Sequence, residues 1–157
     1  MIAVFPMEAD KNAEFNITYM QPPSGGFFMT EQEVLARTIW GEARGEGKDG
    51  MTAVASVIMN RVERGGWFGK TVSSVCKMPW QFSCWNANDP NCQKVIEITT
   101  IDPQYAQALI IAEKAVAREL PDTTGGATHY HEYKIKPKWA AEMKQTTQIG
   151  NHIFYKE

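Results

Sequence analysis

Apolar residues recur at helical spacing in three stretches of the chain. The first stretch follows a capping-box pattern at residues 30–33, in which a threonine caps the helix and a glutamate three positions later reaches back to it. The second covers about residues 49–63 and stops at a Gly-Gly pair. The third begins at an Asp-Pro pair, residues 102–103, with an N-cap residue followed by proline at the first helical position. The pattern therefore predicts three helices ahead of Pro121.

The period of the pattern changes in the last quarter of the chain. Residues 127–135 alternate and carry β-formers, which predicts a strand. Residues 138–144 are typical of a short helix, and residues 148–155 indicate either two short strands around Gly150 and Asn151 or one strand with a bulge. The predicted class is α+β, mainly α, with a small antiparallel sheet.

The N-terminal segment lacks such a pattern. Residues 1–28 include a stretch rich in proline and glycine, so we expect an irregular N-terminal arm there and a single domain over residues 29–157. The start of the chain has no basic region ahead of its short apolar stretch, so no secretory signal is expected.

Composition and charge exclude some partners. The chain has 157 residues, 43% of them apolar and 22% charged, which is typical of one globular domain. Its net charge of −2 argues against a nucleic-acid partner, because a duplex binder needs a concentrated basic face. No apolar run approaches the roughly 20 residues that cross a bilayer, so we expect no membrane insertion.

Three cysteines, Cys76, Cys84 and Cys92, are spaced by eight residues. An odd number excludes a fully paired monomer, and the spacing lacks the C-x-x-C pair of many zinc sites. Two interpretations remain. The thiols are inert and buried, or one disulfide forms in an oxidising setting, with Cys76–Cys84 as the first choice.

The first helix ends in an unusual segment, GEARGEG, residues 41–47. Glu42 lies two residues after the apolar Trp40, and burial beside such a neighbour raises a carboxyl pKa because the charged form loses water. A raised pKa makes a general acid at neutral pH, as cleavage of a glycosidic bond requires. Gly41 and Gly45 would let a long substrate approach the backbone. The alternative is a flexible charged turn in which Glu42 is solvated.

A long loop over residues 66–92 is rich in aromatic and amide side chains. The aromatic residues are Trp67, Phe68, Trp80, Phe82 and Trp85, interleaved with Gln81, Ser83, Asn86 and Asn88. Aromatic faces with amides between them suit the C–H faces and hydroxyl edges of sugar rings. Alternatively, the aromatic side chains anchor the loop to the core.

Histidines offer a different chemistry. His129 and His131 flank Tyr130 and share one face of the predicted strand, and His152 lies in the last strand. Three histidines can hold zinc, as in a hydrolase that cuts an amide. Their spacing does not follow H-E-x-x-H, so hydrogen-bonded strand histidines or substrate contacts are the other interpretation.

Five segments in one order resemble the SleB-type cell wall hydrolase family, which comprises spore cortex-lytic enzymes and phage or bacterial peptidoglycan hydrolases. The segments are LARTIWGEARGE, GMTAVASVIMNRV, PWQFSCWN, THYHEYKIKPKWA and IGNHIFY, and they extend over about residues 33–155. The resemblance implies a lysozyme-like, mostly helical fold, of the kind shared with resuscitation-promoting factors and lytic transglycosylases. It also implies cleavage of the β-1,4 bond between N-acetylmuramic acid and N-acetylglucosamine. We expect no cofactor and no metal.

The resemblance carries site residues with it. The catalytic glutamate of the family is the first Glu of G-E-A-R-G-E, which is Glu42 here. The QFS segment and the H-Y-H strand are implied to line the groove, through Gln81, Phe82, Ser83, Tyr130 and His131. Trp85 of the aromatic loop is a further candidate for sugar binding, and Glu46 is the second carboxylate nearest in sequence.

We therefore expect a lytic transglycosylase in which Glu42 is general acid and then base. Three alternatives stay open: a muramidase with Glu46 as second carboxylate, a zinc-dependent N-acetylmuramoyl-L-alanine amidase that uses the three histidines, and a non-catalytic glycan-binding module. The compact unit without an export signal favours a phage endolysin, which a holin releases from the host cytoplasm to act on the cell wall. We expect a monomer whose partners are peptidoglycan glycan strands.

Overall fold

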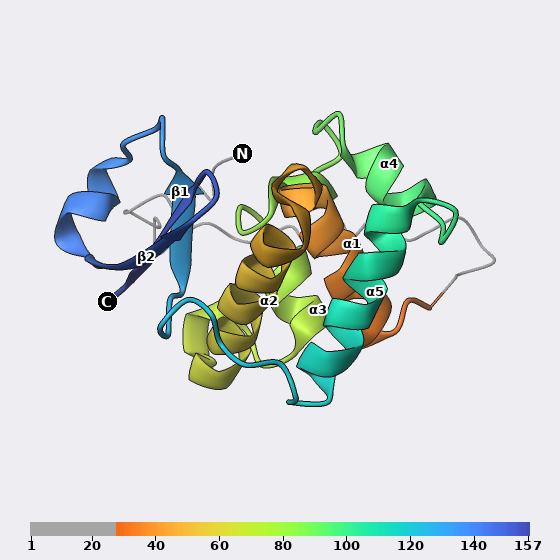
Figure 1. The fold of residues 1–157 in the computed structure, drawn as a ribbon, viewed down its shortest axis with the longest axis horizontal. Coiled ribbons are helices and arrows are strands. Elements are labelled where there is room, and N and C mark those ends of the chain that lie inside the picture. The colour runs from red at the N-terminus through yellow and green to blue at the C-terminus, as the bar shows by residue number, and fades with distance from the viewer. Residues whose placement is uncertain (1–27) are drawn as a thin grey trace, which may run out of the picture.

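The computed structural model describes residues 28–157, and the predicted arm at residues 1–28 lies outside this part except for Phe28. Figure 1 shows the helices on one side and the small sheet on the other, with α2 nearest the sheet. The α-helices are α1 (Glu31–Ala43), α2 (Gly47–Arg64), α3 (Val72–Lys77), α4 (Cys92–Glu97) and α5 (Pro103–Val116). The strands are β1 (His129–Glu132), β2 (Lys144–Ile149) and β3 (His152–Lys156). The predicted class, α+β and mainly α, is confirmed.

The three predicted helices form, and their caps explain where they begin. Thr30 Oγ1 accepts from Glu33 N at 3.2 Å, and the Glu33 carboxylate accepts from Thr30 N at 2.8 Å, which closes the predicted capping box. Hydrogen bonding to the Thr30 backbone lowers the pKa of Glu33. Asp102 caps α5 by accepting from the backbone amides of Gln104 and Tyr105.

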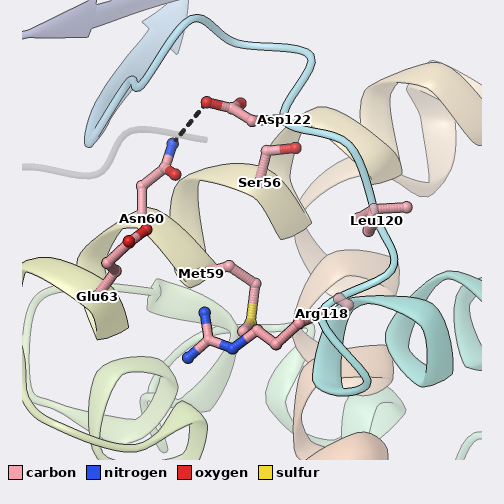
Figure 2. Close-up of a pocket in the computed structure, with 8 residues that line it drawn as sticks. Ser56, Met59, Asn60, Glu63, Arg118, Leu120 and Asp122 are labelled. Carbon is pink, nitrogen blue, oxygen red and sulfur yellow. Dashed lines mark hydrogen bonds between the residues drawn. The ribbon is translucent and has the colours of Figure 1, made fainter.

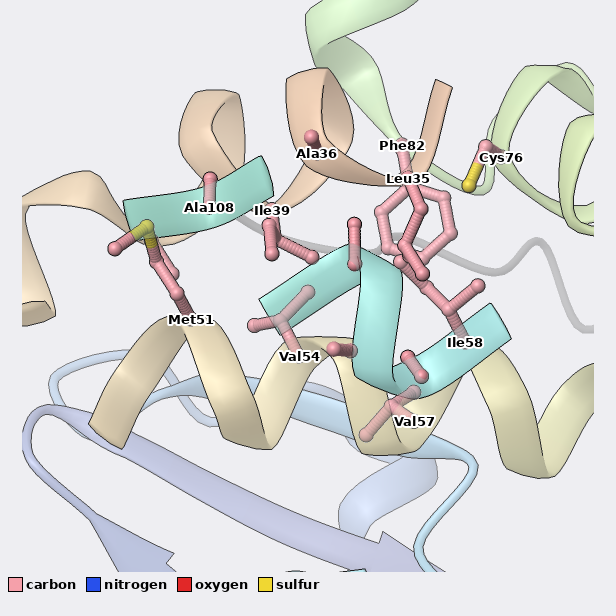
Figure 3. Close-up of a cluster of buried hydrophobic side chains, with 14 of the residues drawn as sticks. Leu35, Ala36, Ile39, Met51, Val54, Val57, Ile58, Cys76, Phe82 and Ala108 are labelled. Atoms are coloured by element: carbon pink, nitrogen blue, oxygen red, sulfur yellow. The ribbon is translucent and has the colours of Figure 1, made fainter. Parts of the chain in front are cut away.

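The core lies where α1 meets α2 and α5. Figure 3 shows side chains of α1 and α2 facing one another, with Cys76, Phe82 and Ala108 closing the cluster. Burial of this apolar surface from water is the main force that holds the helices together. The helical side of the molecule therefore forms a rigid base for the ends of α1 and α2.

The sheet has the strand order β1-β3-β2 and is antiparallel throughout. Tyr130 pairs with Phe154, and a bulge separates Gln145 from Thr147 in β2. Of the two interpretations of residues 148–155, two strands around a turn is confirmed, and β2 begins earlier than the pattern indicates. The short helix predicted at residues 138–144 is the 3-10 helix η4 (Lys138–Glu142).

The aromatic loop contains more structure than its sequence pattern predicts. Within residues 66–92 lie η2 (Gly66–Phe68), α3 and η3 (Ser83–Trp85), and α4 follows directly. Both α3 and α4 have six residues, too few to show a helical period. A local signal was present at α3, because Thr71 and Ser74 form a capping box.

Of the two interpretations of the cysteines, the Cys76–Cys84 disulfide is contradicted, since both are free cysteines in the structure. Cys76 lies on α3 and Cys84 on η3, and both are buried. Burial raises the pKa of the Cys76 thiol to about 12 and also raises that of Cys84. Both side chains act as small apolar groups of the core, as the other interpretation holds.

In the part of the chain that the structure describes, no helix combines the length and the apolar surface needed to cross a bilayer.

Candidate active site

Glu42 is the next-to-last residue of α1, at the point where this helix meets η3 and β1. Part of the residue remains accessible to solvent, whereas Oε1 is inaccessible and accepts no hydrogen bond from any residue in the range 28–157. Tyr130 Oη donates to Oε2 over 3.1 Å. The Tyr130 hydroxyl therefore holds the carboxyl group through Oε2.

Burial of Glu42 raises its carboxyl pKa, because the charged form loses water. Cys84 and the Tyr130 hydroxyl oppose part of this rise, because polar hydrogens near a carboxylate favour its charged form. The net direction remains upward. Glu42 is thus better suited than an exposed carboxyl group to hold a proton and to give it to a bound substrate.

Tyr130 is buried in β1, and its ring packs against two side chains of β3. The ring centroids lie 5.0 Å from His152 and 5.7 Å from Phe154. Burial and the neighbouring Glu42 carboxylate both raise the pKa of the phenol. Tyr130 therefore stays protonated and acts as a hydrogen-bond donor to Glu42. Its expected contact with substrate in the groove is wrong, because the side chain does not reach the surface.

Gly41 has a packing role that differs from the one expected. A Cβ at this position would lie 2.9 Å from Val95 Cγ2 and 3.0 Å from Cys84 Cβ, so glycine lets η3 and α4 lie directly against the last turn of α1. Gly41 is buried and offers no surface for a substrate. Gly45 is exposed and has open space around it.

Glu46 is bound to the turn between β2 and β3. Its two carboxylate oxygens accept from the backbone N–H and the side-chain amide of Asn151, each at 2.8 Å. Hydrogen bonding to the Asn151 backbone lowers the pKa of Glu46. A Cβ on Gly150 would collide with the same carboxylate. Glu46 thus has a structural partner that accounts for both of its oxygens.

Two residues that were expected to line the groove are instead part of the core. Gln81 is fully buried, donates to Phe68 O at 3.2 Å and accepts from Arg61 Nη1 at 3.1 Å. Phe82 is only 2% exposed and belongs to the core cluster in Figure 3. The prediction that these two side chains contact substrate is wrong, because neither reaches the surface.

Each of the two interpretations of the aromatic loop holds for some of its residues. Phe68 and Phe82 anchor it to the core, whereas Trp67 and Trp80 are exposed to 57% and 68%. Trp85 is partly buried, and its Nε1 donates to Thr38 Oγ1 at 2.9 Å. Ser83 begins η3 next to Cys84 and is partly exposed, so it remains a candidate contact.

The histidines do not form a zinc ligand set. His129 Nδ1 pairs with Thr128 Oγ1 at 2.9 Å, and burial lowers its pKa to about 3. His131 is buried and lies between Tyr155 Oη and the Glu132 carbonyl, so its expected place in the groove is wrong. Within residues 28–157, no three side chains of His, Cys, Asp or Glu are grouped to hold a metal. The geometry disfavours the amidase hypothesis.

A cavity of about 140 Å³ lies between α2 and the end of α5, away from the candidate site residues. Figure 2 shows its lining, which includes Asn60, Arg118 and Asp122, with Asn60 Nδ2 donating to Asp122 Oδ2 over 3.3 Å. Glu42 does not line it. The cavity therefore adds nothing to the geometry around Glu42.

A family model described as cell wall hydrolase matches residues 45–155 of the chain. The chain belongs to the cell wall hydrolase family. The matched range contains Glu46, Tyr130 and nearly all of the sheet, and it begins three residues after Glu42. The resemblance stated from the sequence is confirmed.

Relatives of this cell wall hydrolase include spore cortex-lytic enzymes. That of Bacillus cereus is 33% identical over 135 residues, which cover 83% of this chain and 46% of the relative. That of Bacillus subtilis is 29% identical over 138 residues, which cover 83% and 39%. The chain thus spans less than half the length of these curated relatives.

Two solved structures are similar to this cell wall hydrolase over 84% of its chain. The catalytic domain of the germination-specific lytic transglycosylase SleB from Bacillus anthracis has a TM-score of 0.65 and 31% identity, with 98% of that chain covered. The catalytic domain of the Bacillus cereus SleB protein has a TM-score of 0.62 and 30% identity, with 94% covered. The expected lysozyme-like fold is confirmed by this likeness.

Proposed function

We propose that this chain is a peptidoglycan glycosidase that cleaves the β-1,4 bond between N-acetylmuramic acid and N-acetylglucosamine as a lytic transglycosylase. The observation that carries the proposal is the buried Glu42 carboxyl, whose pKa is raised and whose Oε2 accepts from Tyr130 at 3.1 Å. The likeness to a SleB domain described as a lytic transglycosylase supports the same reaction.

The proposed reaction uses one carboxyl group twice. Protonated Glu42 gives its proton to the glycosidic oxygen as the bond from this oxygen to C1 of muramic acid breaks. The Glu42 carboxylate then takes the proton of the muramic acid 6-hydroxyl, whose oxygen bonds to C1. The product is a 1,6-anhydro sugar, and Glu42 regains its proton. The Tyr130 hydroxyl donates to the carboxylate while it is charged.

The contacts of Glu46 support a mechanism with one carboxylate. Hydrolytic glycosidases generally need a second carboxylate as nucleophile or as base for water. Glu46 is the nearest in sequence, and both of its oxygens are bound to Asn151. In a transglycosylase the substrate supplies the nucleophile, so no second carboxylate is required.

The products of wild-type digestion test this function. Purified peptidoglycan is digested in water enriched in oxygen-18, and the fragments are identified by mass spectrometry. We expect anhydromuropeptides without label. Labelled reducing-end muramic acid would instead establish a muramidase, and released stem peptides would establish an amidase. Intact glycan that retains the protein would establish the binding module.

Glu46→Gln tests the second carboxylate directly. We expect kcat to stay within about tenfold of wild type, because a residue that acts as general acid or base contributes about 10²–10⁴-fold. Asn151→Ala removes the other half of the same contact and should have an equally small effect. A loss of two orders of magnitude in Glu46→Gln alone would favour the muramidase hypothesis.

Several expectations about the whole protein stay predictions. We propose the domain boundary at residue 29, the action on the cell wall and the monomeric state from the sequence. Release through a holin as a phage endolysin is likewise a proposal about its biological setting.

A further inference from the structure

Arg61 of α2 is the largest fully buried side chain in the described part of the molecule. A buried charge is unfavourable unless hydrogen bonds and neighbouring groups compensate it. Arg61 Nε donates to Thr128 O at 2.7 Å, and Nη1 donates to Gln81 Oε1 at 3.1 Å. Its guanidinium also lies over Phe82, 5.1 Å from the ring centroid. So many compensating contacts around one buried cation indicate that Arg61 has a specific role.

The partners of Arg61 lie in the two segments that flank Glu42. Thr128 comes directly before β1, two residues ahead of Tyr130. Gln81 comes three residues ahead of Cys84, which packs against the end of α1 beside Glu42. One guanidinium therefore ties together the segments that bring Tyr130 and Cys84 to the carboxyl group.

Asn60, which precedes Arg61, attaches α2 to the same segment ahead of β1. Asn60 Nδ2 donates to Ala127 O at 2.9 Å, as Arg61 Nε does to Thr128 O. Two consecutive residues of α2 thus hold two consecutive carbonyl groups at the entrance of β1. Because backbone positions along a strand are regularly spaced, these two hydrogen bonds fix the position of Tyr130 in β1.

The charge of Arg61 also matters to the proposed reaction. Burial lowers its pKa to about 10, so it remains a cation at neutral pH. Among residues 28–157, the groups that can become negative and act on its charge are, in decreasing order, Tyr130 of β1, Cys76 of α3 and Glu42 of α1, and His129 of β1 also faces it. When Glu42 gives up its proton, a carboxylate forms in a buried place. A fixed cation in that environment favours the charged state.

We propose that Arg61 is a positioning residue of this reaction: it fixes Tyr130 and the Gln81–Cys84 segment against Glu42, and its charge stabilises the carboxylate that Glu42 becomes. The inference rests on the proposed function. It adds a role for a residue that touches neither the substrate nor the reacting atoms.

Three variants separate the charge of Arg61 from its geometry. Arg61→Met removes the charge, and we expect kcat to fall about 10²-fold with KM little changed, as for loss of a preorganised electrostatic group. Arg61→Lys keeps the charge but loses the planar guanidinium that donates to both Thr128 and Gln81, so we expect a smaller loss of kcat. Arg64→Met is the matched control, because Arg64 lies one turn further along α2 and pairs with Glu157 at the surface. Its kcat should not change.

The pH profile gives a readout that a purely structural role would not move. Without the cation, the Glu42 carboxylate is less favoured, so the pH at which kcat/KM declines on the basic side should rise in Arg61→Met. It should stay near the wild-type value in Arg61→Lys. If both variants lost the same activity and the basic side of the kcat/KM profile did not shift in Arg61→Met, the electrostatic part of the inference would be overturned.

A double-mutant cycle with Tyr130→Phe tests the geometric part. If Arg61 acts through Tyr130, the loss caused by Arg61→Lys shrinks in the Tyr130→Phe background, and the two effects are not multiplicative. Multiplicative losses would overturn this part. Folding of every variant is checked by circular dichroism. If the Arg61 variants do not fold, Gln81→Met, which removes an acceptor of the guanidinium, enters the same cycle.

The outcome for Glu42→Gln distinguishes the two levels of the proposal. An active Glu42→Gln variant would contradict the proposed mechanism itself. The role of Arg61 alone would be contradicted if Glu42→Gln were inactive, the losses from Arg61→Lys and Tyr130→Phe were multiplicative, and the basic side of the kcat/KM profile did not shift in Arg61→Met.

Discussion

Glu42→Gln is expected to lower kcat on peptidoglycan by about 10²–10⁴-fold, the contribution typical of a general acid and base. Glutamine keeps the shape of the side chain and can still accept from the Tyr130 hydroxyl, which lies 3.1 Å from Oε2 in the wild type. It cannot carry the proton that the leaving oxygen needs. Initial rates of fragment release, measured by chromatography and mass spectrometry, provide the test.

Glu113→Gln is the matched control, because Glu113 is an exposed residue of α5. It should retain full activity. The pH dependence adds a second test. Since burial raises the pKa of Glu42 and the protonated form is the active one, wild-type activity should decline as pH rises through that raised value. A Glu42→Gln variant that cuts as fast as wild type would contradict the assignment of the acid.

Phe82→Ala is expected to destabilise the protein by about 3–5 kcal/mol, the usual effect of truncating a buried aromatic side chain. Phe82 is 2% exposed, packs within the helical core and lies under the Arg61 guanidinium. The measurement is the free energy of unfolding from urea denaturation, with the slope m compared between variants. The large loss reflects a cavity beneath a buried cation.

Trp80→Ala supplies the comparison within the same loop. Trp80 is 68% exposed, so its truncation should change the unfolding free energy by no more than about 0.5 kcal/mol. If Phe82→Ala instead kept full stability and raised KM, Phe82 would contact the substrate as the family resemblance implied.

Elements with local signals could be predicted from the sequence. The capping box at Thr30 and the Asp102–Pro103 start depend on residues within one turn, and both occur in the structure. The β2–β3 hairpin was also recognisable from its turn. In contrast, α3 and α4 have six residues each, and their formation depends on packing against the rest of the chain.

The site was predictable in one residue and not in its surroundings. Glu42 was identified from its segment, yet the groups that contact its carboxyl, Cys84 and Tyr130, are far away in the sequence. Trp40, the neighbour first invoked, donates its indole N–H to Asp102 instead. Burial of a side chain is a property of the assembled fold, so a motif alone did not reveal that Gln81 lies inside the core.

The position of Arg61 in the sequence already indicates that its side chain is buried. Arg61 recurs at helical spacing with apolar residues of α2, so a charged side chain occupies a core-facing position. Such a position predicts a buried cation with obligatory partners. The identity of those partners, Thr128 and Gln81, required the tertiary structure.

The hydrogen bond between Tyr130 and Glu42 joins residues that are 88 positions apart in the chain. Contacts of such long sequence separation form only after the entropy of closing the intervening loop has been overcome. A nascent chain that has been synthesised only as far as α5 therefore contains Glu42 without its hydrogen-bond donor, Tyr130. In the proposed reaction, the acid gains this donor only when β1 docks against the end of α1.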